Sequence, residues 1–304
     1  MYKQKCGIVK CSIESAGTKY RWKNMNKLFF VILLSIGAVS QLFSAKLIEE
    51  TEYYKKFLVE SPHKINAGFS IELSKNNSYD IYNYTLSVDQ NNEFHLHGFQ
   101  FIVSDLALIE KLPGSSEMRG TKYWDASKKF AWFRWRLRTT QEKFGYFEKG
   151  KSFSNLICIA SGVPGIIEVR LRALVPGVAV DYRVRKDILT VHPPDYKPYK
   201  TIYTIGPVPK PQNQTSMIDH LIATTTGAYR EGWISKADVY QGLMDKLVAA
   251  KENILKGRRN YHTARNIIGA FKHLLDAQRG KAIDEPCYQM LYINADEMIK
   301  MLGG

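Results

Sequence analysis

The chain changes its hydrophobic period once, and this change most constrains its fold. Up to about residue 206, apolar residues alternate with polar ones, which is the period of half-buried β-strands. From Ser216 onward they recur at intervals of three and four, which is the period of amphipathic helices. The sequence therefore predicts an α+β protein with separate domains, an antiparallel β-sandwich followed by a small α-helical bundle.

Short apolar runs separated by Asn, Gly and Pro clusters predict the strands. We expect them at residues 69–73, 80–88, 94–103, 130–137, 156–160, 166–174, 178–184 and 188–191, with one more at 200–205. Residues 46–206 would form one large sandwich, or two small ones divided near residues 113–119. A lead-in helix is expected at residues 47–59.

Proline marks the boundary between the two domains. Six prolines fall between residues 193 and 211, and proline blocks helix continuation, so residues 207–215 are predicted to be an extended linker. Residues 216–304 should then form one short helix and three long ones. The expected boundary residues are Gly227, Ser235 with Asp238 as a capping box, Gly257, Gly280 at a helix end and Asp284 as a cap.

An apolar run precedes the predicted domains. Residues 28–45 follow the basic residues Lys23 and Lys27, which is the plan of a secretory signal. The run of 18 residues contains three Ser and one Gln, whereas a membrane span needs about 20 predominantly apolar residues. We therefore expect residues 1–45 to be a leader, with Met25 as the true start, and we expect no stable membrane span. An uncleaved anchor is the alternative.

The net charge limits the classes of partner. The chain has a formal net charge of +14, and residues 1–45 contain seven of the 43 bases and one of the 29 acids, so the remainder carries +8. That balance is basic but too small for a dedicated nucleic-acid-binding protein. We therefore expect no dedicated nucleic-acid binding.

The chain has few cysteines, and only Cys158 and Cys287 lie after the leader. A disulfide bond between the two could form in an oxidising compartment, which is one interpretation. The interpretation that we favour is two buried thiols that pack as small hydrophobic groups. No Cys/His spacing predicts a zinc site, and no cofactor is expected.

Arginines alternate with apolar residues in three of the predicted strands. Because a strand sends alternate side chains to opposite faces, each run would have an apolar side and an arginine side. If the strands are neighbours, guanidinium groups would share one surface that suits sulfate, phosphate or carboxylate. The alternative is an ordinary solvated face with cross-strand ion pairs such as those of Glu168. The candidate ligand-binding residues are Arg134, Arg136, Arg138, Arg170, Arg172, Arg183, Arg185 and Trp132.

Two further patterns are less specific. His95 and His97 would share one side of a strand with Glu93, which is a loose metal-ligand pattern; surface histidines without metal are the alternative. The aromatic residues between Tyr123 and Trp135 would either form core or stack on sugar rings. Trp132 falls on the arginine side of its strand and is the best exposed candidate.

These patterns predict a protein without catalytic activity. No nucleophile elbow, phosphate loop or dinucleotide fingerprint is present. We expect an exported binding or surface-associated protein, in the periplasm, at the cell surface or outside the cell. Its partner would be an anionic polysaccharide or envelope component. The alternatives are an enzyme that uses the His95/His97 region and an assembly protein whose helical bundle docks a partner.

Several segments of the predicted bundle carry a resemblance to a known family. They are residues 247–251, 255–257, 264–271 and 276–281, and the last helix from residue 283 through 294–296 to 302. This part resembles the FIMAH-type domain, a helical module at the ends of exported bacterial proteins. The resemblance implies export and a bacterial source, and it implies no catalytic residues. The β part looks like an immunoglobulin-like accessory domain.

Overall fold

A computed structural model describes residues 64–76, 79–93, 95–113, 118–125, 130–137, 147–173 and 199–303, without the side chains of residues 76, 125, 130, 136 and 137. The secretory leader, the lead-in helix at residues 47–59 and the strands expected at 178–184 and 188–191 lie outside these residues. So do residues 193–198, the first part of the proline-rich stretch.

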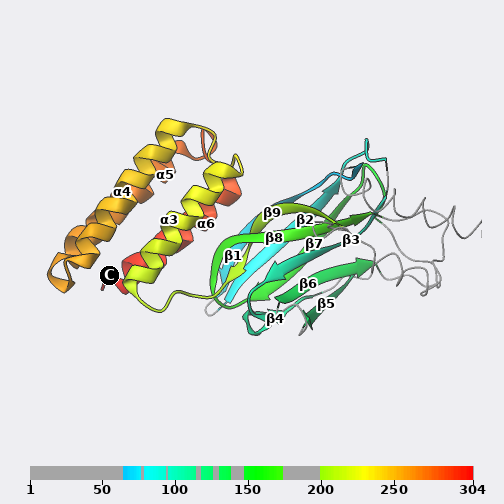
Figure 1. The fold of residues 1–304 in the computed structure, drawn as a ribbon, viewed down its shortest axis with the longest axis horizontal. Coiled ribbons are helices and arrows are strands. Elements are labelled where there is room, and N and C mark those ends of the chain that lie inside the picture. Colours follow the sequence, from blue (N-terminus) through cyan, green and yellow to red (C-terminus); the bar gives the residue numbers. More distant parts are fainter. Residues whose placement is uncertain are drawn as a thin grey trace, which may run out of the picture. The chain divides into compact units, whose positions relative to one another are not determined.

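The β part consists of two antiparallel sheets (Figure 1). The first has the strand order β1–β2–β7–β4 and the second β5–β6–β3–β8–β9, so strands from before and after residue 113 occur in both sheets. Together with the helices that follow, this arrangement confirms the predicted fold class. The strands are β1 (Ala67–Asn76), β2 (Tyr79–Val88), β3 (Leu96–Val103), β4 (Ile109–Lys111), β5 (Met118–Asp125), β6 (Phe130–Leu137), β7 (Ser152–Ala160), β8 (Val163–Ala173) and β9 (Lys200–Val208).

Aromatic rings fill the space between the two sheets. Phe101 of β3 is fully buried, and its ring contacts rings of both sheets. Its centroid lies 4.8 Å from that of Phe133 in its own sheet, and 4.8 Å and 5.0 Å from those of Tyr84 and Phe69 in the other. The alternation of β3 thus puts its aromatic side chains into the core and its polar ones on the opposite face.

Strands β4 and β5 were not predicted from the sequence. In β5, Gly120 occupies a position that faces the core, opposite Trp135. An apolar side chain at this position would have shown the alternation that predicts a strand. A Cβ at Gly120 would clash with the Leu112 backbone, so the missing side chain is what lets these segments approach closely. The apolar–polar alternation is therefore interrupted at Gly120 because of its close contact with Leu112, which the sequence by itself does not show.

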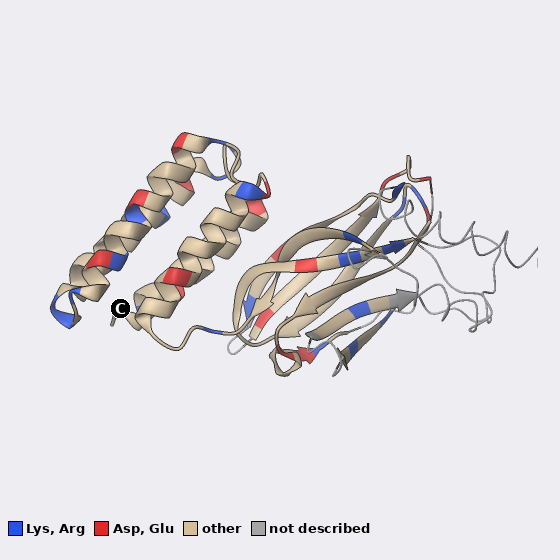
Figure 2. Cartoon of the chain, viewed as in Figure 1, with Lys and Arg blue, Asp and Glu red and all other residues tan. Residues whose placement is uncertain are grey.

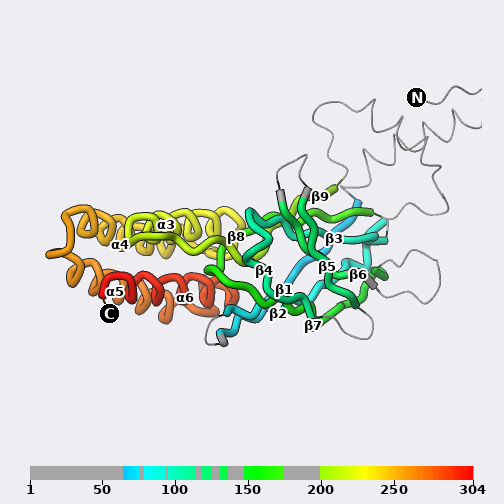
Figure 3. Tube along the Cα trace, turned by 90° about the horizontal axis from the view of Figure 1, so that it is seen from below, coloured from blue at the N-terminus to red at the C-terminus, as the bar shows by residue number. Residues whose placement is uncertain are grey.

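Four helices follow: α3 (Gln214–Arg230), α4 (Ala237–Leu255), α5 (Tyr261–Gln278) and α6 (Glu285–Met301). Helix α3 packs against α4 and α6, and α5 packs against the same two, which closes a four-helix bundle (Figure 3). Gly257 and Gly280 have φ values of +94° and +68° and follow the ends of α4 and α5, as predicted.

One predicted helix end and one predicted helix cap are wrong, although α4 begins at Ala237, close to the predicted start. Helix α3 does not stop near Gly227 but continues to Arg230. A Cβ at Gly227 would lie 2.6 Å from Cδ1 of Ile166, so this glycine serves close packing on β8. The capping box expected at Ser235 is also absent: Lys236 precedes α4 without a side-chain cap, and the Ser235 hydroxyl donates to the Ala282 carbonyl.

The bundle contacts the sandwich through polar groups of α6. The Asn294 side chain is fully buried, and its Nδ2 donates to the Pro164 carbonyl of β8 over 2.8 Å. Gln289 accepts from the Leu73 amide of β1 over 3.1 Å. These bonds join the end of the sandwich to one helix, while the division into domains at 46–206, 207–215 and 216–304 stays a prediction.

A charged cluster completes this junction. The Glu297 carboxylate, with 7% of its side chain exposed, lies 2.9 Å from Nζ of Lys75, 2.6 Å from that of Lys210 and 2.8 Å from that of Lys300. The carboxylate loses solvent on burial, but hydrogen bonds from the three lysines outweigh that loss and lower the pKa of Glu297 to about 2. The ionised carboxylate of Glu297 in α6 therefore binds Lys75 of β1 and Lys210, which lies just before α3, and so joins these three segments.

Asp80 lies beside this cluster and is expected to weaken it. The residue is 5% exposed, its Oδ1 has no hydrogen-bond partner among the described residues, and burial raises its pKa above the ordinary 3.8. Because the folded-state pKa of Asp80 is raised, the contribution of this residue to stability is fully present below pH 3.8 and is lost as the pH rises through its folded-state pKa.

We therefore expect Asp80→Asn to raise the free energy of unfolding at pH 7 by about 1 kcal/mol, because a buried charge is removed. At pH 3 the variant should match the wild type. Urea unfolding at both pH values measures the effect, and an equal gain at both would show that the charge is not its cause.

Candidate ligand-binding face

The predicted arginines of β6 and β8 lie on one face of the five-stranded sheet. Strand β3 runs between β6 and β8, and its Gln100 pairs with Arg170. Directly paired residues point to the same side of a sheet, so Trp132 shares this side through its pair Ile102. We call this side, opposite the one that carries Phe133 and Val169, the arginine face; Figure 2 shows basic segments on both strands.

The structure brings together only part of the predicted set. Arg134, Arg170 and Arg172 are half-buried on the arginine face. Arg136 pairs with the exposed Arg119 of β5, so the backbone register puts it on the same face, although its side chain lies outside the described part. The remaining three, Arg138, Arg183 and Arg185, also lie outside the described residues.

Arg170 is largely neutralised within its own strand. Its Nε lies 2.6 Å from Oε1 of Glu168, two residues earlier, and its guanidinium stands 4.4 Å from the Tyr199 ring centroid. The expected pairing of Glu168 with an arginine is thus present, but along β8 instead of across strands. Arg170 consequently contributes less net charge to the arginine face than Arg134 does.

The β5–β6 end of the face carries an aromatic pair with a guanidinium group. The rings of Tyr123 and Trp132 lie 5.3 Å apart, and the Arg134 guanidinium stands 4.9 Å from the Trp132 centroid. Tyr123 is 54% exposed. Arg134 Nε and Thr121 Oγ1 are buried without a hydrogen-bond partner in the described part of the chain, so an acceptor at this corner would be favourable.

The other end of the face has a similar pair that sequence reasoning missed. Tyr203 of β9 is 41% exposed and pairs with Glu168, and Arg230 at the end of α3 stands 5.7 Å from the Tyr203 centroid. The alternation of Tyr199, Thr201 and Tyr203 could have placed Tyr203 on this side. The helix end that supplies Arg230 could not have been found, because only the docked bundle brings it there.

The other aromatic residues divide between core and surface. Phe133 and Trp135 are buried, as the core interpretation predicts. Trp124 is 46% exposed on the opposite side of β5 from Tyr123. The Phe130 side chain is not described. Trp132, the candidate singled out from the sequence, is half-buried on the arginine face.

The metal-ligand pattern at Glu93, His95 and His97 is not assembled. Strand β3 begins only at Leu96, so the three residues do not alternate along one strand. The Glu93 carboxylate is instead 3.0 Å from Nζ of Lys64. Within the described ranges, no group of three His, Cys, Asp or Glu side chains could hold a metal ion.

Cys158 and Cys287, the two cysteines among the described residues, are free and buried, as the favoured interpretation predicts. Burial raises the pKa of the Cys158 thiol well above its ordinary value and that of Cys287 to about 12. Both thiols are therefore protonated at neutral pH and are poor nucleophiles.

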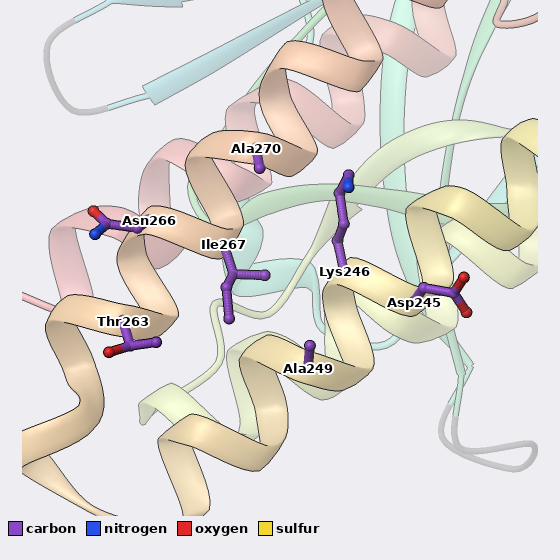
Figure 4. Close-up of a pocket in the computed structure, with 7 residues that line it drawn as sticks. All are labelled: Asp245, Lys246, Ala249, Thr263, Asn266, Ile267 and Ala270. Atoms are coloured by element: carbon purple, nitrogen blue, oxygen red, sulfur yellow. The ribbon is translucent and has the colours of Figure 1, made fainter.

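A surface groove of about 440 Å³ lies between α4 and α5 (Figure 4). Every lining side chain is exposed or half-buried, so the groove is a depression between two packed helices, and we assign no site to it. Its lining residues are Asp245, Lys246, Ala249, Thr263, Asn266, Ile267 and Ala270.

Comparison with protein-family models and with curated proteins found no match for this chain. The resemblances to FIMAH-type and immunoglobulin-like domains therefore stay predictions from the residues. Among the helices that the structure describes, none is long and apolar enough to cross a membrane.

Proposed function

We propose that the protein is an exported, non-enzymatic binding protein whose arginine face holds an anionic polymer. The observation that carries this proposal is the cluster of Tyr123, Trp132 and Arg134. It combines an exposed ring, a second ring beside it and a guanidinium group whose Nε has no hydrogen-bond partner among the described residues.

The charge on the face supports the same proposal. Arg119, Arg134 and Arg172 lie on the face together with the Glu168–Arg170 pair. The register puts Arg136 and Asp125 on the same side, with both side chains outside the described part. Planar guanidinium groups form paired hydrogen bonds with carboxylate, sulfate and phosphate. The face is thus positive overall and offers donors that match such groups.

Binding of the full chain to a panel of polyanions tests this proposal. We expect Arg134→Ser with Arg172→Ser to lower the affinity at least tenfold, because each charged hydrogen bond contributes about 1.5–3 kcal/mol. Wild-type affinity should also fall as salt rises, since polyanion binding releases counterions.

The matched control is Arg258→Ser with Arg259→Ser, which removes the same charge from exposed positions of the bundle. This variant should bind within about twofold of the wild type, because exposed charges remote from a binding site contribute little. Unfolding midpoints show whether each variant is folded. If both double variants lose affinity equally, net charge and not the arginine face determines binding.

A further inference from the structure

Aromatic–guanidinium pairs lie at both ends of the arginine face. Trp132 with Arg134 marks the β5–β6 end, and Tyr203 with Arg230 marks the β9 end. Because the strands are neighbours in the order β5–β6–β3–β8–β9, three spacings of about 4.8 Å place β6, which carries Trp132 and Arg134, about 14 Å from β9, which carries Tyr203. A ligand that contacts both pairs must therefore be extended.

The backbone register shows that these pairs lie in one row across the strands. Tyr123 pairs with Trp132, and Trp132 pairs with Ile102 of β3. On the other side, Glu168 pairs with Tyr203. Phe101 pairs with Val169, so the next positions, Ile102 and Glu168, are neighbours and complete the row. An extended ligand in contact with both rings would cross the strands instead of running along them.

Beside this row, the central strands present polar groups with little net charge, while Ile102 within the row is apolar and Arg172 lies two residues beyond Arg170 on β8. Gln100 and Thr201 flank the Arg170–Glu168 ion pair and present amide and hydroxyl groups. Such amide and hydroxyl groups can donate hydrogen bonds to the hydroxyls of sugars and accept hydrogen bonds from them. Exposed aromatic rings, with an apolar face and a polar edge, suit stacking on sugar rings.

We infer that the polymer is an acidic glycan that lies across the strands, with its sugar rings on Tyr123 and Trp132 at one end and on Tyr203 at the other. This inference rests on the proposed function and specifies its ligand. The carboxylates of the glycan meet Arg134 at one end and Arg230 at the other, where Arg230 is 70% exposed and its Nε also lies 3.3 Å from Oε1 of Glu231. The hydroxyls of the glycan meet the polar groups between the two ends.

Size-defined oligogalacturonates and polygalacturonate are the probes, with the full chain in solution. Affinity should rise with oligomer length and then level off once the chain spans both ends. Tyr203→Ala should weaken binding of the longest oligomers at least fivefold and leave the shortest nearly unchanged. Trp132→Ala should weaken binding at every length.

The matched control is Tyr79→Ala, which removes a ring of similar exposure from the other sheet. If Tyr203→Ala behaves like Tyr79→Ala at every length, the ligand does not span the face. If dextran sulfate or polyphosphate binds through Arg134 and polygalacturonate does not, this inference is wrong and the proposed function stands. If no polyanion binds, the proposed function itself fails.

Discussion

Replacing Phe101 with alanine should lower the free energy of unfolding by about 3–5 kcal/mol, the usual cost of deleting a buried aromatic side chain. The ring is fully buried and touches five other rings, drawn from both sheets. Its removal opens a cavity that rigid aromatic neighbours cannot close by small shifts. Denaturant unfolding should show a lower midpoint with an unchanged slope.

Ile102→Ala is the matched control for this prediction. Ile102 is the next residue along β3, but it is half-buried on the arginine face and lies outside the aromatic core. We expect its replacement to cost about 1 kcal/mol, in proportion to the smaller area that it buries. Equal losses for Phe101→Ala and Ile102→Ala would contradict the packing described between the two sheets.

Replacing Glu297 with alanine should lower the free energy of unfolding by about 2–3 kcal/mol, toward the low end for breaking a buried ion pair. The carboxylate is buried, whereas the three lysines keep 43–60% of their side chains exposed. Removing it leaves three ammonium groups close together, although water screens part of their repulsion. Thermal or urea unfolding of the full chain measures the loss.

The stabilisation by Glu297 should depend on pH in one direction. Its folded-state pKa of about 2 lies below the ordinary 4.5, so its contribution is present above pH 4.5 and is lost as the pH falls toward 2. Wild type and Glu297→Ala should therefore differ at pH 7 and converge near pH 2. A difference that persists at pH 2 would mean that lost packing, not lost charge, causes the effect.

A second ion-paired glutamate of α6 provides the control. Glu285 lies 2.6 Å from Nε of Arg279, but 44% of its side chain is exposed. Glu285→Ala should cost no more than about 1 kcal/mol, because exposed pairs contribute little. A cost equal to that of Glu297→Ala would show that burial at the junction is not what makes Glu297 important.

The sequence alone determined the fold class. It also determined that, in the strand that carries the candidate site, the arginines lie on the side opposite the apolar residues. The period of two around Phe133 and Arg134 requires those side chains to lie on opposite sides of a strand, and the period of three to four after residue 216 requires helices. Both follow from local backbone geometry, so they could be read without knowing any long-range contact. The same local reasoning identified Trp132 as the aromatic residue on the arginine side.

Tertiary contacts decided the rest, because they join residues far apart in the chain. The pairing of β3 with both β6 and β8 puts Arg134 and Arg170 on one face, and no local pattern encodes that choice of partners. In the sequence, Gly227 predicted the end of a helix. In the structure it lies inside α3, where the absence of a side chain allows close packing against Ile166. The Glu297 cluster likewise gathers its lysines from three separate segments, so only the docked bundle creates it.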